Sequence, residues 1–495
     1  MKGQLKTEQK GWLGKRWGSP NPLPVALTIS ALLTLALASC QVVTQFSATA
    51  TATLRPIDTP VATIAPPTPT SSPTPILTFT PTPSPGATQT ADRSPLTPQE
   101  RTTLEAVAEE VEQLRELASD APLALAFMTP EELSDWLVGE LAEDYSPQEA
   151  HREARVYAAL ELLPPDTDLY SLILALYTEQ VAGFYDHEMD HMTVVGDEAS
   201  LDIIGKITFA HEHLHALQDQ FLGLDTLQTY RETADDDDAV RAVTALIEGD
   251  AQMVTALYLL NHLSEVDVTV LDGVQTGDFD AAPLILREEM LFPYLDGLAF
   301  VQALYGRGGW DAVNDAYDAP PQSTEQILHP EKYLAGEAPI AVSLPPLTST
   351  LRSEPQDAGP GADWQLVEEN TLGEFLLHLY LDVHLPGTVA QDASAGWGGD
   401  RFALYEHSAT GDSLLLIVIV WDDEAEGAEF ASAYAAFAGD KYGGASTFED
   451  ALGTWWQGEN EITLLSAGKG QTIIVVGSEA DAVEHARQAL AGMAH

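Results

Sequence analysis

The spacing of apolar residues divides the chain into regions of different predicted architecture. Over residues 97–333 the apolar residues mostly recur every three or four positions, as on the buried face of an amphipathic helix. Residues 339–363 are rich in Pro, Gly, Ser and Thr, which is typical of a boundary between domains. We therefore expect a mostly helical domain over 99–338, a linker over 339–363 and a smaller C-terminal domain over 364–495.

The helical region contains one predicted β-hairpin. Helices are expected to start after Thr129 and Ser146, because each is followed by Pro at the first helical position and by Glu three residues after the cap. A helix over about 168–180 leads into an apolar run at 181–185, a polar turn and a second short run at 192–195. These two runs predict antiparallel strands, and the helical pattern resumes at Ile203.

The C-terminal region has a different pattern. Strands are predicted at 402–406, 414–420, 461–466 and 471–476, and helices over 372–383, 424–437 and 480–490. This order predicts a small α+β domain with a mainly antiparallel sheet. The fold class of the whole chain is therefore expected to be α+β.

The first forty residues predict an export signal. A leader with five basic residues precedes an uncharged apolar run over 23–37, which suits a signal-peptide core and is short for a membrane-spanning helix. The run ends in LASC at 37–40, which resembles the bacterial lipobox, where the cysteine is lipidated and becomes the first mature residue. An ordinary signal peptide or an uncleaved anchor with an incidental cysteine is the alternative. Because Cys40 is the only cysteine, we expect 1–39 to be a lipoprotein signal peptide and Cys40 to be lipidated.

The segment after Cys40 predicts a tether. Residues 47–98 are dominated by Thr, Pro, Ser and Ala, with few charges. Frequent proline removes backbone donors and favours extended polyproline conformations, so this segment cannot build a core. We expect residues 40–98 to be a disordered tether that links the folded part to a membrane of the bacterial cell envelope, outside the cytoplasm.

Charge and cysteine content exclude some functions. The 495 residues include 22 Lys+Arg against 76 Asp+Glu, giving a formal net charge of −54. Nucleic-acid binding needs a basic surface, so we expect no nucleic-acid partner. A single cysteine allows no intramolecular disulfide, so a fold outside the cell must rest on packing, metals or ligands.

Candidate chemistry is concentrated on one predicted helix. The pattern HExxH occurs as HEHLH at 211–215, within an apolar stripe that ends before Gly223. His211 and His215 are four residues apart and project from one helix face, which allows both imidazoles to bind one Zn²⁺. Glu212 is then placed to take a proton from a water molecule that the metal activates. His213 is rotated by about 200° from His211 and is not expected to be a ligand.

Glu248 is the third expected ligand. It lies inside a second predicted helix, which follows the acidic run 235–238. A carboxylate among apolar neighbours needs a partner, and Gly249 and Ala251 are small enough to let another helix approach closely. An ion pair of Glu248 with Arg241 or Arg287 is the alternative. Two His, one Glu and one open water position form a catalytic rather than a structural zinc set, so we expect one Zn²⁺ per chain.

These residues carry a family resemblance. HEHLH, followed 33 residues later by EGDA at 248–251, resembles the gluzincin type of zinc metallopeptidase. More closely, HEHLHALQDQ, EGDA and PPQSTEQILHP resemble largely uncharacterised bacterial exported lipoproteins with HELTHALQDQ-like helices, over about residues 179–333. The resemblance implies a zincin-like fold for the helical domain. It also implies an antiparallel edge strand that pairs with an extended peptide, here 192–195. The metzincin pattern does not fit, because Gln218 and Phe221 occupy its Gly and His positions.

Further site residues are less constrained by the sequence. In thermolysin-like enzymes a His or Tyr stabilises the oxyanion of the tetrahedral intermediate. By analogy, the candidates for this role are His329 and Tyr294, and no fixed spacing in the sequence selects one of them. Asp219, one turn after His215, is a candidate for orienting that imidazole, with a solvated helix acid as the alternative.

The sequence thus predicts a membrane-tethered zinc metallopeptidase that acts on protein or peptide substrates with Glu212 as general base. One alternative is a non-catalytic surface-binding lipoprotein with a structural or relic zinc site. Another is a zinc-dependent hydrolase of a non-peptide amide in the cell envelope. An intact Glu212 favours an enzyme, because a purely structural site needs no general base.

Overall fold

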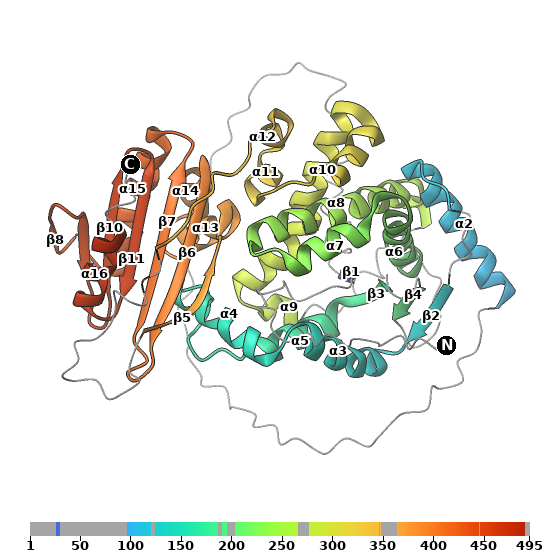
Figure 1. Cartoon of the computed structure of the whole chain (residues 1–495). Coiled ribbons are helices and arrows are strands. Elements are labelled where there is room, and N and C mark those ends of the chain that lie inside the picture. The colour runs from blue at the N-terminus through green and yellow to red at the C-terminus, as the bar shows by residue number, and fades with distance from the viewer. Residues whose placement is uncertain are drawn as a thin grey trace, which may run out of the picture.

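The protein has an α+β fold in which a mostly helical part lies beside a C-terminal part built on a large sheet (Figure 1). The computed structural model describes residues 26–29, 97–119, 124–186, 191–195, 203–265, 277–345, 347, 364–444 and 446–490. Cys40 and most of the predicted tether lie outside the described residues.

The helical part starts where the sequence predicts. Capping boxes at Thr97 and Ser146 begin the first and third of its helices, and Asp168 caps the fourth. The helices are α2 (Pro98–Arg115), α3 (Pro130–Asp144), α4 (Pro147–Ala159), α5 (Leu169–Gln180), α6 (Ile203–Leu222), α7 (Leu224–Thr233), α8 (Asp237–Asn261), α9 (Gly277–Ala281), α10 (Leu284–Asp318), α11 (Thr324–Leu328) and α12 (Pro330–Ala335).

Helix α8 forms the centre of this part. Asp236 caps it by accepting bonds from the backbone N–H groups of Asp238 (3.1 Å) and Ala239 (3.2 Å), as the acidic run 235–238 predicts. The helix packs against α6 and α10. Its length and apolar character would suffice to cross a membrane, but 78% of its most apolar stretch is buried inside the fold. It is therefore a core helix.

A small sheet lies next to α6. It contains β1 (Ala26–Ile29), β2 (Ala124–Met128), β3 (Val181–Asp186) and β4 (His191–Val195), in the order β1-β3-β4-β2. Strands β3 and β4 form the predicted antiparallel hairpin. The prediction that 192–195 is an edge strand is wrong, because β4 also pairs with β2, in parallel. The outer edge of β3 pairs antiparallel with β1, which belongs to the predicted signal peptide.

The C-terminal part confirms the predicted antiparallel α+β architecture. Its sheet has seven strands in the order β5-β6-β7-β11-β10-β9-β8, all paired antiparallel. The strands are β5 (Trp364–Asn370), β6 (Trp397–His407), β7 (Ser413–Trp421), β8 (Phe448–Glu449), β9 (Thr454–Gln457), β10 (Ile462–Gly468) and β11 (Gln471–Gly477). The helices are α13 (Gly373–Asp382), α14 (Gly387–Ser394), α15 (Glu424–Lys441) and α16 (Ala480–Leu490).

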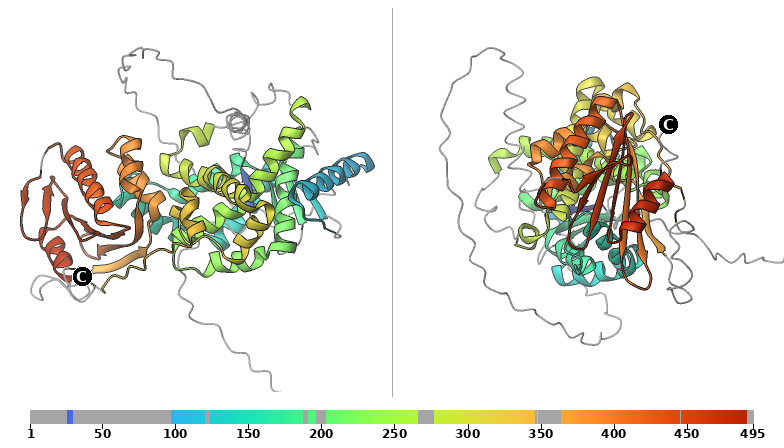
Figure 2. Two further views of the ribbon diagram at one scale, coloured as in Figure 1. Left: turned by 90° about the horizontal axis from the view of Figure 1, so that it is seen from above. Right: turned by 90° about the vertical axis from the view of Figure 1, so that its left-hand side faces the viewer.

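Helices cover both faces of this sheet (Figure 2). Along β7, Ile417 packs into the core shared with α13, α14 and α15, whereas Leu416 packs into the core shared with α16. This alternation follows the two-residue period of a strand.

The two parts are packed together rather than merely linked. The larger core continues from the helical part into the C-terminal part, and the rings of Phe292 and Phe375 lie 4.5 Å apart across the junction. Four basic side chains also bridge it. They are Arg155 to Glu406, Lys332 to Asp422, Arg401 to the carbonyl of Asp235, and Lys441 to Glu161.

Candidate metal centre

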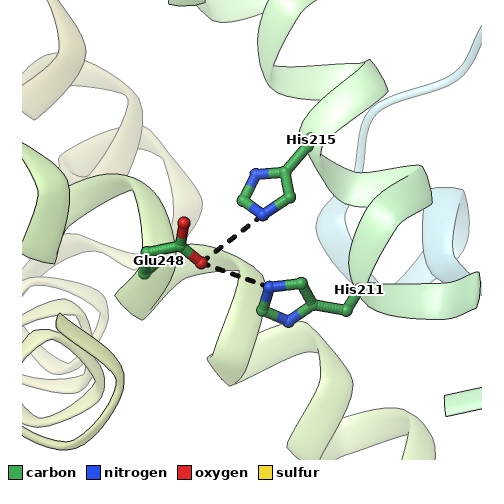
Figure 3. A group of neighbouring side chains, drawn as sticks. All are labelled: His211, His215 and Glu248. Atoms are coloured by element: carbon green, nitrogen blue, oxygen red, sulfur yellow. Dashed lines mark hydrogen bonds and ion pairs between the residues drawn. The ribbon is translucent and has the colours of Figure 1, made fainter. Parts of the chain in front are cut away.

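Helices α6 and α8 bring the three predicted ligands together. The Nε2 atom of His211 lies 3.2 Å from Oε2 of Glu248, and the Nε2 atom of His215 lies 3.5 Å from the same oxygen (Figure 3). All three residues are buried, and their potential ligand atoms lie within 4.8 Å of one another. The HExxH spacing therefore places two imidazoles on the α6 face that meets Glu248.

This arrangement fits a zinc ion. In a tetrahedral site with bonds of 2.0–2.1 Å, ligand atoms are separated by about 3.3 Å, close to the two distances found here. Two nitrogens and one carboxylate oxygen are also donors that Zn²⁺ prefers. The Nε2 atoms of His211 and His215 both face the Glu248 carboxylate, so one metal ion between them can take all three residues as ligands.

The charges of the site support one another. Burial by itself raises the pKa of Glu248, but the charge of His215 and hydrogen bonds from both histidines hold this pKa well below its usual value. Burial by itself lowers the pKa of His215, but the Glu248 carboxylate raises it to about 9. A carboxylate held ionised in the protein interior is an attractive site for a cation.

Glu212 lies next to the ligands and differs from Glu248 in its surroundings. It is fully buried, and no side chain among the described residues forms a hydrogen bond with its carboxylate, although a backbone hydrogen bond from Tyr185 of β3 lowers its pKa in part. Burial raises its pKa to about 8. Gly183 of β3 lies close by, since a Cβ there would be 3.7 Å from Cγ of Glu212 and 2.9 Å from Cγ2 of Thr208. The glycine thus allows the strand to pass against the helix at the candidate base.

The alternative partner for Glu248 is not supported. Arg241 instead forms an ion pair with Glu289, with its Nε 3.0 Å and its NH2 2.9 Å from Oε1. The partners of Glu248 are the two histidines and the hydroxyl of Tyr294.

His213 points away from the centre, as its position on the helix predicts. Its ring stacks on Phe209 at 5.9 Å, and its Nε2 lies 3.4 Å from Oε1 of Glu112. Burial lowers its pKa to about 4, so the imidazole is neutral near pH 7.

The predicted role of Asp219 in orienting His215 is wrong. Asp219 instead accepts a hydrogen bond from the hydroxyl of Tyr185 at 2.9 Å. The residue beside His215 is Gln218, whose Oε1 lies 2.7 Å from Nδ1. A signal for this contact is present in the sequence. Gln218 is a polar residue in the buried stripe, three positions after His215 and directly after Leu217.

The structure separates the two candidates for oxyanion stabilisation. Tyr294 of α10 is buried, and its ring lies 6.0 Å from that of His211. Burial and the nearby charges of Glu248 and Glu212 raise the pKa of Tyr294 well above its usual value. His329 is instead directed to the C-terminal part, with its Nε2 2.9 Å from Oε1 of Glu374. Of the two, only Tyr294 belongs to the centre.

A second group of acids, Glu325, Glu337 and Asp422, has the spacing of a metal site. Lys332 already occupies its centre, with Nζ 2.6 Å from Glu325 and 3.1 Å from Glu337, and bonded to Asp422. This group is therefore an ion-pair cluster.

Comparison with known proteins bears on the C-terminal part alone. A family described as a domain of unknown function (DUF8575) matches residues 364–487. No curated protein and no solved structure matches the chain.

Proposed function

We propose that the protein is a zinc metallopeptidase whose active site lies between α6, α8 and β3. One observation carries the proposal. Two imidazoles and one carboxylate converge with the spacing of a tetrahedral metal site, beside a second buried carboxylate, that of Glu212, to which no side chain among the described residues forms a hydrogen bond. A structural zinc site has no need of this additional acid, whereas a hydrolase requires a general base.

His211, His215 and Glu248 would hold the metal. When bound, zinc would supply a Lewis acid that polarises the scissile carbonyl and makes water a better nucleophile at neutral pH. Glu212 accepts the proton of the attacking water and passes it to the departing amine. Glu212 follows His211 directly in the chain, and the positive charge of a bound metal would favour the ionised carboxylate that accepts the proton.

Tyr294 would act at the carbonyl oxygen. Its hydroxyl is un-ionised at neutral pH because of the raised pKa, so it can donate a hydrogen bond. As negative charge develops on the carbonyl oxygen, this donor stabilises it more than it stabilises the ground state.

An extended peptide is the substrate that the small sheet suits. Strand β3 passes against Glu212 at Gly183, and its outer edge, which pairs antiparallel with β1, would become free once the predicted signal peptide that contains β1 is removed. A peptide paired on this edge would run along the active helix, with alternate side chains facing opposite sides. In this proposal β3 takes the role that the sequence had assigned to 192–195.

The protein would act while anchored. Lipidation of Cys40 would hold it on a membrane of the bacterial cell envelope, and the segment to residue 98 would set its reach. The anchor and the active site are separate parts of the proposal and are tested separately below.

The test is the replacement Glu212→Gln in the purified, zinc-loaded protein. The variant should retain zinc and lose cleavage of a broad peptide library, because the amide cannot accept the proton. Glu109→Gln, an exposed residue on α2, is the matched control and should cleave like the wild type. Undiminished cleavage by Glu212→Gln would exclude the mechanism. Zinc binding without any cleavage by the wild type would favour a surface-binding protein instead.

A further inference from the structure

A chain of buried polar side chains lies behind His215, on the side away from Glu248. Gln218 Oε1 lies 2.7 Å from Nδ1 of His215, and Gln218 Nε2 donates to the carbonyl of Ile247 at 2.9 Å and to Oδ2 of Asp250 at 3.3 Å. Asp250 in turn binds Arg115 of α2 and Tyr317 of α10. The chain therefore links one proposed metal ligand to three other helices.

The donors and acceptors in this chain allow only one arrangement. The carbonyl of Ile247 can only accept hydrogen bonds, and the carboxylate of Asp250 accepts them from Arg115 and Tyr317. The NH₂ group of Gln218 must therefore face them, which leaves its carbonyl oxygen facing His215. Since that oxygen can only accept, Nδ1 of His215 must carry a proton. The Nε2 atom, on the Glu248 side, is then the nitrogen that can bind a metal.

Besides Gln218, two side chains hold Asp250 in place. Arg115 donates to it twice, from Nε to Oδ1 at 2.8 Å and from NH2 to Oδ2 at 3.2 Å, and the hydroxyl of Tyr317 donates at 2.8 Å. Arg115 is fully buried, lies 4.3 Å from the ring centre of Trp310 and donates from NH2 to Asn314 at 2.7 Å. A bidentate buried pair of this kind fixes both position and charge.

His211 is held in a similar way by a different residue. The hydroxyl of Thr255 donates to the carbonyl of Ala251 at 2.8 Å, so its oxygen is left to accept from Nδ1 of His211 at 3.3 Å. Both imidazoles thus direct Nε2 to Glu248. The bond to Gln218 is the shorter of the two and is connected to a charged pair.

We propose that Gln218 is the positioning residue for His215, and that the Arg115–Asp250 pair fixes the amide of Gln218 in the orientation this requires. The inference rests on the proposed function only in taking zinc as the bound metal. Partners that orient a histidine ligand in this way typically contribute about 10–100-fold to metal affinity.

The experiment compares full-length wild type, Gln218→Met and Asp219→Asn. Methionine has a similar shape, but its thioether is a much weaker acceptor for the Nδ1 proton of His215 than the amide oxygen is. It also has no N–H group to donate to Asp250. Zinc affinity is measured by competition with a chromophoric chelator, and the visible spectrum of the Co²⁺-loaded protein reports the ligand geometry. The melting temperature in excess chelator reports whether the fold is intact. Selective ¹⁵N labelling of histidine reports whether Nδ1 of His215 is protonated.

Gln218→Met should bind zinc about 10–100-fold more weakly and show an altered Co²⁺ spectrum, while Asp219→Asn should match the wild type in both. Wild-type His215 should carry the Nδ1 proton in the metal-free and zinc-loaded forms. Unchanged zinc affinity in Gln218→Met, or an unprotonated Nδ1 in the wild type, would overturn the proposal. The protonation of Nδ1 in wild-type His215, measured by NMR, can overturn the proposal even if Gln218→Met does not fold. A wild type that binds zinc with the expected tautomer but cleaves no peptide would contradict the peptidase, and leave the role of Gln218 standing.

Discussion

Gly249 and Gly297 lie directly against each other where α8 crosses α10. A Cβ on Gly249 would overlap the carbonyl carbon and oxygen of Gly297, and a Cβ on Gly297 would overlap the carbonyl oxygen of Ala245. Gly249 follows the proposed ligand Glu248, and Gly297 lies one helical turn after Tyr294. The contact between the two glycines therefore brings the phenol of Tyr294 toward the metal centre.

Gly249→Ala should destabilise the protein and disturb the centre together. The added methyl group has no room, so the helices must separate, at an expected cost of about 1–3 kcal/mol in the free energy of unfolding. Denaturant unfolding in chelator and zinc titration would measure the two effects. Gly139→Ala is the control, because its Cβ would meet no atom within 4 Å, and it should stabilise α3 by about 0.5–1 kcal/mol. Equal stability of Gly249→Ala and wild type would show that the helix contact is not tight.

Removing either histidine ligand should remove the metal. The wild type should bind about one equivalent of Zn²⁺, whereas His211→Ala and His215→Ala should bind none after gel filtration, since two donors hold zinc weakly. His213→Gln should retain the metal because this ring faces Glu112. Elemental analysis of the eluted protein measures all four. Full zinc content in both alanine variants would eliminate the proposed site.

Tyr294 and His329 should differ sharply in their effect on turnover. Tyr294→Phe should keep zinc and lower kcat by about 10²–10³-fold, because it removes a donor to the developing oxyanion. His329→Gln should leave kcat unchanged, since the imidazole is bonded to Glu374. Steady-state kinetics on one cleavable peptide would compare them. A large effect on kcat from His329→Gln, with none from Tyr294→Phe, would reverse the assignment.

Asp400 should make the stability of the protein depend on pH. It is buried near the start of β6 and accepts hydrogen bonds from the backbone N–H groups of Leu372 and Gly373 and from the indole N–H of Trp397. Burial nevertheless raises its pKa to about 6. The native state therefore binds this proton more tightly than the unfolded chain does, so the stabilisation is complete below about pH 4 and is lost as the pH rises through about 6.

The measurement for Asp400 is the free energy of unfolding against pH, in chelator, for wild type and Asp400→Asn. The difference between them should change by about 1–3 kcal/mol between pH 4 and 6, with the wild type losing stability as the pH rises. A difference that is constant over this interval would contradict the assignment. Asparagine has one acceptor oxygen fewer than aspartate, so the two proteins should also differ in the free energy of unfolding by an amount that does not depend on pH. Only the part of the difference that changes with pH reports the pKa of Asp400.

Cys40→Ser should release the protein from the membrane fraction or leave it as an uncleaved precursor. Among the described residues, the one helix of membrane-spanning length and composition is α8, which is mostly buried, so no other described helix offers an anchor. Cell fractionation and the mass of the mature N-terminus measure the result. Normal cleavage with continued membrane attachment would contradict lipidation at Cys40.

Local signals account for the parts of the structure that the sequence predicted. The predicted capping boxes at Thr129 and Ser146 and the acidic cap of α8 act over three residues and fix where helices begin. The HExxH spacing places His211 and His215 on one face by helix geometry alone. Glu248 was found because a carboxylate in an apolar helix must have a partner.

The remaining features depend on contacts between distant segments. Strand β2 pairs in parallel with β4, more than sixty residues later, and its short run carries no alternation that would reveal it. Arg115 and Asp250 are 135 residues apart, so their pairing has no signature in the sequence. The choice between Gln218 and Asp219 turns on a rotation of about 100° around α6, which sequence spacing does not decide without knowing where α8 lies.

The C-terminal part does not complete its own core. Phe375 on α13 packs against Phe292, and the carboxylate of Asp238 occupies the space where Gly373 would carry a side chain. The family match over 364–487 thus describes a unit with one face finished by the preceding segment of this chain. Residues 364–490 expressed alone would expose that apolar face and associate through it. In this chain, the helical segment that precedes the domain is therefore part of how the domain folds.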